Sequence, residues 1–262
     1  MYKRIFWPLA FVALAGTSSA RAGTNDEGHW VTTFTGGTDV IAHGTLQEHS
    51  EGSLARLGGL DTANADDPAT TSLRSLSMHD VFRLGPGLGF ELGYMADSSL
   101  EPFMKLEYSQ LRGRNERIGE LESPALLAPA GINGKFDDMH SWALNFGSRY
   151  FWNDGGTVRP YLAGFMGATR TEAMRTHLSV TGMGNLGEEE LLPQQTRFDA
   201  GLEGGVKFQL ADNADLRLSV GANYVDARKK TTDAFAPLGM DSVQVTEQRW
   251  SVPVDVGLSY RF

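Results

Sequence analysis

A few residues of this chain have types and spacings that could support chemistry. His140 and Ser141 are a base and a nucleophile in adjacent positions. Neighbouring residues of a β-strand point to opposite faces, so in a strand these two side chains would not pair. Possible metal ligands occur in an early polar segment, at His43, His49, Asp66 and Asp67. Their spacing is irregular, and we predict no catalytic residue, no metal site and no cofactor.

Gly85, Gly87 and Gly89 could be taken for a phosphate-binding loop. Such a loop joins a strand to the N-terminus of a helix. These glycines instead lie inside a pattern of period two, and no helical pattern follows them. We expect them to make room inside a sheet structure.

The elements that must position these residues are strands, because apolar and polar residues alternate over most of the chain. The last strand is the clearest, with an apolar face formed by Trp250, Val252, Val254, Val256, Leu258, Tyr260 and Phe262. Similar alternation predicts about eight strands, near residues 30–38, 81–94, 100–111, 139–152, 157–171, 197–210, 216–224 and 248–262.

The connections between these strands alternate between long and short, which places all long loops at one end. We predict an all-β fold, a transmembrane antiparallel β-barrel of about eight strands with short periplasmic turns and long extracellular loops. The long loops are expected near residues 41–77, 113–136, 175–195 and 228–242, with a short helix near 53–60. Ten strands remain possible if the first loop contains a hairpin.

The polar faces of the strands would point into one narrow interior, because a barrel of this size is just wide enough for side chains to fill. Cations and anions are nearly balanced there, and isolated buried charges are costly. We therefore predict an interior network of ion pairs with water among it. Its members are Arg83, Glu91, Lys105, Glu107, Arg149, Arg197, Asp199, Glu203, Lys207, Arg217, Arg249 and Asp255.

The composition and the amino terminus point to export. The chain has 262 residues, no cysteine and a formal net charge of -9, so a disulfide scaffold and thiol chemistry are excluded. Lys3 and Arg4 precede an apolar run at residues 5–15, which is too short to span a bilayer as a helix. Ala20 and Ala22 provide a cleavage site. We predict a signal peptide at residues 1–22 and a barrel domain at 23–262.

The sequence resembles those of small outer-membrane β-barrels of the OmpA/OmpX type. The resemblance rests on Tyr260 and Phe262 at the end of the last strand and on the stretches at 87–94 and 159–164. The resemblance implies that Tyr260 and Phe262 form a signal for the barrel-assembly machinery. It also implies an integral protein of the outer membrane of a Gram-negative bacterium, with lipids and lipopolysaccharide as neighbours. Nothing in the pattern suggests a nucleic-acid partner.

The function remains open between several alternatives at this point. A structural or surface-interaction role with a largely filled lumen is preferred, and we predict that the chain is not an enzyme. A narrow porin-like channel would need a continuous water path through the interior. An adhesin or surface antigen would bind an extracellular ligand through the long loops. A lipid-modifying enzyme is the least favoured alternative, because it would need a Ser/His pair at the rim.

Overall fold

The computed structural model describes residues 27–54, 56–57, 60–61, 69–124, 126–152, 156–226, 229–240, 243–246 and 248–262. The predicted signal peptide with Ala20 and Ala22, and the acidic residues Asp66 and Asp67, lie outside these ranges.

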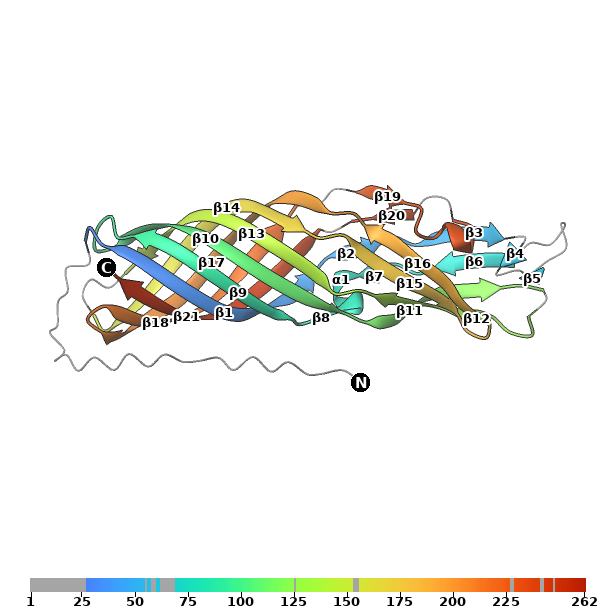
Figure 1. Cartoon of the computed structure of the whole chain (residues 1–262), viewed down its shortest axis with the longest axis horizontal. Coiled ribbons are helices and arrows are strands. Elements are labelled where there is room, and N and C mark those ends of the chain that lie inside the picture. Colours follow the sequence, from blue (N-terminus) through green and yellow to red (C-terminus); the bar gives the residue numbers. More distant parts are fainter. Residues whose placement is uncertain are drawn as a thin grey trace.

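Eight long strands form a closed antiparallel barrel, as the alternation predicts (Figure 1). They are β1 (Trp30–His43), β9 (Pro86–Tyr94), β10 (Leu100–Gly113), β13 (Met139–Phe151), β14 (Val158–Thr171), β17 (Gln195–Ala211), β18 (Ala214–Val225) and β21 (Arg249–Arg261). Each strand pairs with its predecessor and successor in this series. The alternative of ten barrel strands is therefore wrong.

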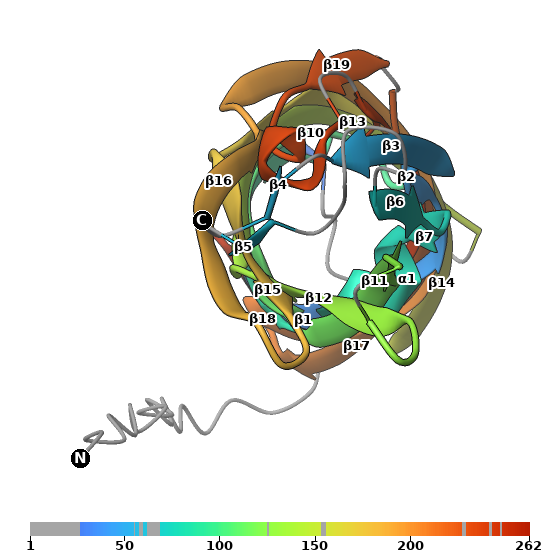
Figure 2. The same ribbon diagram turned by 90° about the vertical axis from the view of Figure 1, so that its right-hand side faces the viewer.

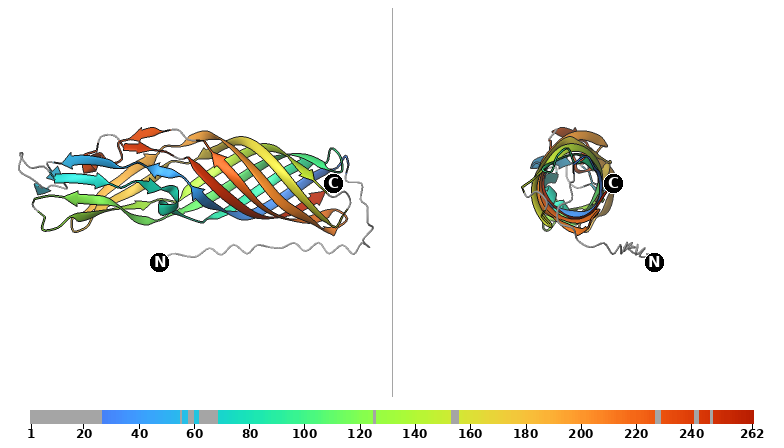
Figure 3. Two further views of the ribbon diagram at one scale, coloured as in Figure 1. Left: turned by 180° about the vertical axis from the view of Figure 1, so that it is seen from behind. Right: turned by 90° about the vertical axis from the view of Figure 1, so that its left-hand side faces the viewer.

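The first and last strands close the barrel. β1 pairs with β21 in antiparallel register, with Val31 opposite Arg261 and Phe34 opposite Leu258. Trp30 and Phe262 exchange backbone hydrogen bonds of 3.2 and 3.0 Å at the end of this pair. The view along the axis from the terminal end shows a closed ring of strands (Figure 3). A closed ring satisfies the backbone groups that lipid cannot.

The outer face of the barrel carries a belt of apolar side chains bounded by aromatic rings. Among the described residues, every large exposed apolar side chain except Leu84 and Leu127 lies on a barrel strand or directly beside one. At the terminal end, Trp30 packs against Tyr94 with ring centroids 5.1 Å apart. At the opposite end, Tyr108 packs against Trp142 at 4.9 Å. Two such girdles mark the interfaces of a membrane.

The segments predicted as long loops continue beyond the barrel as β-structure, and this part is called the extension (Figure 1). Its larger sheet has the order β16-β15-β12-β11-β6-β3. These strands are β3 (Ser50–Leu54), β6 (Ala69–Leu73), β11 (Asn115–Glu122), β12 (Ala130–Phe136), β15 (Met174–Val180) and β16 (Gly184–Leu192). The smaller elements are β2 (Thr45–Gln47), β4 (Arg56–Leu57), β5 (Leu60–Asp61), β7 (Leu76–Ser77), β19 (Lys230–Thr232) and β20 (Val243–Val245).

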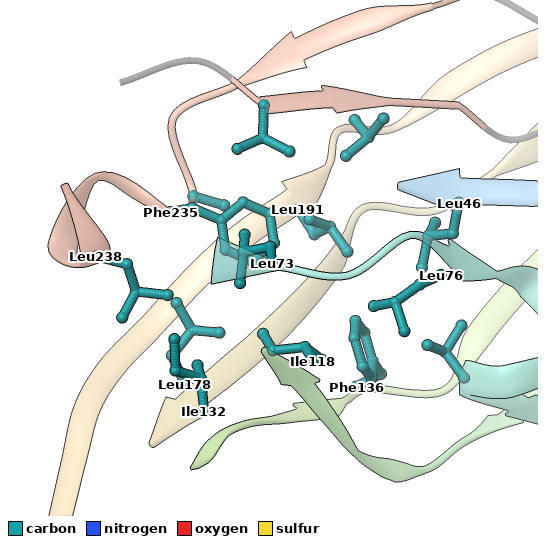
Figure 4. Packing of buried hydrophobic residues seen from close by; sticks show 14 of the residues in the cluster. Leu46, Leu73, Leu76, Ile118, Ile132, Phe136, Leu178, Leu191, Phe235 and Leu238 are labelled. Atoms are coloured by element: carbon teal, nitrogen blue, oxygen red, sulfur yellow. The ribbon is translucent and has the colours of Figure 1, made fainter. Parts of the chain in front are cut away.

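The long loops lie at the predicted end but contain β-strands, and the helix predicted near 53–60 is wrong, because β3, β4 and β5 lie there. The extension encloses an apolar core, so its polarity is the inverse of the barrel's. Leu73, Leu76, Ile118, Ile132 and Leu178 are at most 1% exposed within it (Figure 4). Polar residues alternate with them on the outer face, which is the pattern of a sheet in water.

Two short helices help to fill the core of the extension. Figure 2 shows the extension from its outer end, with its strands arranged around this core. α1 (Met78–Val81) and the 3-10 helix η1 (Ala236–Leu238) place Met78, Val81 and Leu238 in it. No helix in the described ranges is long and apolar enough to cross a membrane.

α1 begins with a capping box, in which Ser77 and Asp80 exchange hydrogen bonds. Burial opposes ionisation of Asp80, but the bonds from the Ser77 backbone and hydroxyl hold its pKa below the usual value.

One predicted lumen residue, Arg83, lies outside the barrel. In the pairing of β10 with β9, Ser109 lies opposite Gly87, whereas in its pairing with β8 (Phe82–Arg83), Arg112 lies opposite Arg83. The second register is shifted by one residue, which forms a bulge at 84–85. A shift of one residue turns side chains to the opposite face. Arg83 is therefore exposed, and Phe82 is buried in the extension core.

We predict that Leu73→Ala selectively loosens the extension. Leu73 has no exposed surface, and truncating a buried leucine lowers the free energy of unfolding by about 2–5 kcal/mol. Hydrogen exchange of the refolded protein should become faster in β3, β6 and β11 and unchanged in the barrel strands. Leu127→Ala is the control, because Leu127 is fully exposed. Equal effects of both substitutions would show that the apolar cluster is not a packed core.

Candidate functional site: a filled lumen and an extracellular groove

Most of the predicted lumen residues point into the barrel. Ten are buried, namely Glu91, Lys105, Arg149, Arg197, Asp199, Glu203, Lys207, Arg217, Arg249 and Asp255. Glu107 is partly buried, with 20% of its side chain exposed, and it contacts Lys105. Arg83 is the member that lies outside, because of the bulge described above.

The centre of the lumen is an ion-pair network around Arg149. Arg149 donates two hydrogen bonds to the Glu91 carboxylate, of 3.0 and 3.1 Å, and one of 2.8 Å to Glu101. Arg217 donates to the same Glu91 carboxylate at 2.8 Å. The Arg149 guanidinium also lies 4.8 Å from the ring centroids of Phe103 and Tyr161. Arg149 is therefore compensated by bidentate pairing and cation–π contact, and Arg217 by its ion pair with Glu91.

Two further groups extend the network along the lumen. Tyr161 donates a hydrogen bond of 2.6 Å to Glu203. Lys105 lies 3.0 Å from Glu107 and 3.9 Å from Asp255.

Sequence reasoning missed several members. Asp215 contacts Lys207 and Arg261 at 3.2 Å each, and neither Asp215 nor Arg261 was assigned to the network. Glu101 was also missed, although it lies on the same inward face of β10 as Lys105. The alternation identifies Glu101 within the predicted strand 100–111, and it identifies Asp215 once the next-to-last strand is extended to its observed start at Ala214.

Apolar side chains fill the interior on both sides of these charges. A cluster around Val31, Met95, Phe103, Phe151 and Tyr161 lies partly at the level of the Arg149 network and partly toward the terminal end. The core of the extension fills the other side (Figure 4).

The outer face of the extension carries a groove of about 490 Å³ across β11, β12, β15 and β16. It is lined by Asn115, Glu116, Arg117, Asn133, Gly134, Lys135, His177, Leu178, Ser179 and Asn185. Amide, hydroxyl and cationic groups dominate this lining, and the sheet beneath it rests on the buried apolar core. The groove was not predicted, because its residues come from segments assigned to loops.

A cluster of possible metal ligands lies beside the groove. Asp137, His177 and Glu188 each offer one potential metal-ligand atom, and these three atoms lie within 4.8 Å of one another. The Glu188 carboxylate also accepts a hydrogen bond of 2.9 Å from Arg175. This bond, with the carboxylate's charge, raises the pKa of Arg175. A cation bound here would therefore compete with Arg175 for Glu188.

The residues first considered for chemistry do not form a catalytic site in the described ranges. Ser141 is buried and contacts Thr171, whereas His140 is only partly buried and lies 2.7 Å from the Tyr108 hydroxyl. They point to opposite faces, as predicted. His43 is exposed at the end of β1, and His49 contacts Glu51 at 3.3 Å.

Tyr260 and Phe262 are 48% and 63% exposed on the outer face of the barrel. Their role as an assembly signal stays a prediction.

Comparison with known proteins places this geometry in a family. The outer membrane protein beta-barrel domain matches residues 9–262. No curated protein matches the sequence. Among solved structures, the chain is similar to Neisserial surface protein A, with 14% sequence identity and a TM-score of 0.41. The similarity covers 90% of this chain and 98% of that chain.

OprG from Pseudomonas aeruginosa is similar with 15% identity, a TM-score of 0.45 and coverage of 92% of this chain and 98% of the other. Ail from Yersinia pestis has 15% identity, a TM-score of 0.37 and coverage of 90% and 99%. The family match over residues 9–262 shows that the chain belongs to the outer membrane protein beta-barrel family and lies in the outer membrane of a Gram-negative bacterium.

Proposed function

We propose that this outer-membrane barrel does not conduct and acts as a surface-binding protein, with a saccharide-type extracellular ligand held in the groove of the extension. The observation that carries the proposal is the apolar core of the extension. It makes the displayed segments a folded body, whose outer face is rigid before a ligand arrives. Binding to a preorganised surface avoids the entropy cost of ordering loops.

The filled lumen argues against the alternative of a narrow channel. A channel requires a continuous path, whereas Arg149, Glu91 and Arg217 pair across the lumen and are at most 2% exposed. One apolar cluster packs against this network, and the other lies beyond it in the extension. Removing one charged residue would leave the apolar clusters in place.

The lining of the groove favours a ligand rich in hydroxyl groups. Asparagine amides and the serine hydroxyl both donate and accept hydrogen bonds, as sugar hydroxyls do. Asn115, Asn133, Asn185 and Ser179 supply such groups. Lys135 adds positive charge for acidic sugars, whereas Arg117 is paired with Glu120 and Glu116 with Arg74. The volume of about 490 Å³ lies within the usual range for small-ligand sites.

We predict that the refolded full-length protein shows no steady single-channel conductance in a planar bilayer. The ion-pair network and the two apolar clusters block the path. The Glu203→Ala and Arg217→Ala variants should be equally silent, after folding is verified by circular dichroism. Steady conductance that changes with either substitution would contradict the proposal and favour a channel.

We also predict that Asn115→Ala combined with Lys135→Ala weakens saccharide binding about thirtyfold, since each substitution removes polar contacts worth about 1 kcal/mol. The measurement is titration calorimetry of the refolded protein with a panel of defined neutral and acidic oligosaccharides. Thr70→Ala is the matched control, because Thr70 is exposed on β6 of the same sheet but does not line the groove. If no oligosaccharide binds, or if the control falls equally, the groove is not a saccharide site.

A further inference from the structure

Two arginines are brought together on the outer surface by the bulge between β8 and β9. Arg83 and Arg112 lie directly opposite each other in the β8–β10 pair, and both are exposed. The bulge is built into the chain at Gly85, because a side chain there would collide with the backbone carbonyl of Gln110. Bulges often re-aim a side chain, and this one moves Arg83 from the lumen side to the outside.

The charge arrangement of this pair is unfavourable unless an anion binds. Like charges directly opposite on neighbouring strands destabilise a sheet. Neither Arg83 nor Arg112 forms an ion pair with any described residue. The adjacent carboxylate, Asp138, is occupied by hydrogen bonds of 2.8 Å from the Gln110 amide and 2.9 Å from the Gly113 backbone.

The position of the pair fits the headgroup layer of the membrane. Tyr108 belongs to the outer aromatic girdle, and Arg112 lies two outward positions further along β10, roughly 13 Å along the strand. Strand tilt shortens this height, and an arginine side chain can bend back toward the interface. Leu84, next to Arg83, is 54% exposed, so apolar surface continues to the level of the pair.

We propose that Arg83 and Arg112 form a clamp for a phosphate group of an outer-leaflet lipid, such as the phosphorylated glucosamine of lipid A. Paired guanidinium groups match phosphate oxygens in geometry and charge. Bound phosphate neutralises the facing cations, while Leu84 and the aromatic girdle contact the apolar part of the same lipid. The site is independent of the saccharide groove.

The test uses the refolded full-length protein in detergent micelles. Diphosphorylated lipid A is titrated, and the bound fraction is measured by native mass spectrometry. The combined variant Arg83→Gln and Arg112→Gln should bind about tenfold more weakly, since hydrogen bonds to charged groups are lost. Dephosphorylated lipid A should bind the original protein and this variant equally. Arg83→Lys with Arg112→Lys should recover part of the affinity.

Arg175→Gln is the matched control, because Arg175 is an exposed arginine in β15 that pairs with Glu188 at 2.9 Å and does not line the groove. It should leave lipid A affinity unchanged. Equal losses in the control and the clamp variant would overturn the proposal, as would full affinity in a clamp variant shown to be folded. Competition by inorganic phosphate at concentrations equal to those of lipid A would also overturn it, because the site would then hold free phosphate and not a lipid.

Discussion

Every backbone polar group that crosses a membrane needs a partner within the protein, and the rest of this structure follows from that requirement. Closure joins segments from the two ends of the chain, as in the contact between Thr33 and Ser259, 226 positions apart. Once closed with eight strands, the ring encloses a narrow interior. The charges of the polar face must then pair within it, and Arg149 with Glu91 and Glu101 is the result.

The same chain meets two solvents, and its polarity inverts between them. Below the outer girdle, apolar residues such as Phe146 face lipid and charges face inward. Above it, Ile132 and Leu178 face inward and polar residues face water. The hydrogen-bonded strands run on across this change, for example from β10 toward β11. One set of strands thus supports both a membrane barrel and a water-soluble core.

The barrel could be predicted from sequence because lipid imposes a long and regular alternation, as in 248–262. The extension could not, because its inward residues are few per strand and lie among charges and glycines, as around Ile118 and Gly119. Arg83 was misplaced for a different reason. The face on which a side chain lies is predicted by counting alternate residues along the strand. A single extra residue at 84–85 moves the preceding side chains to the opposite face without changing the composition. The groove depends on packing between four such strands, which no single segment specifies.

The length of the extension determines what can reach it. From Tyr108 at the girdle to Asn115 and Arg117 in the groove, the chain advances roughly 23–30 Å at the usual rise per residue. That stand-off exceeds the thickness of the lipid headgroups several times. The groove on the extension is therefore held clear of the bilayer plane, where bulky molecules in the surrounding medium can approach it without first displacing lipid.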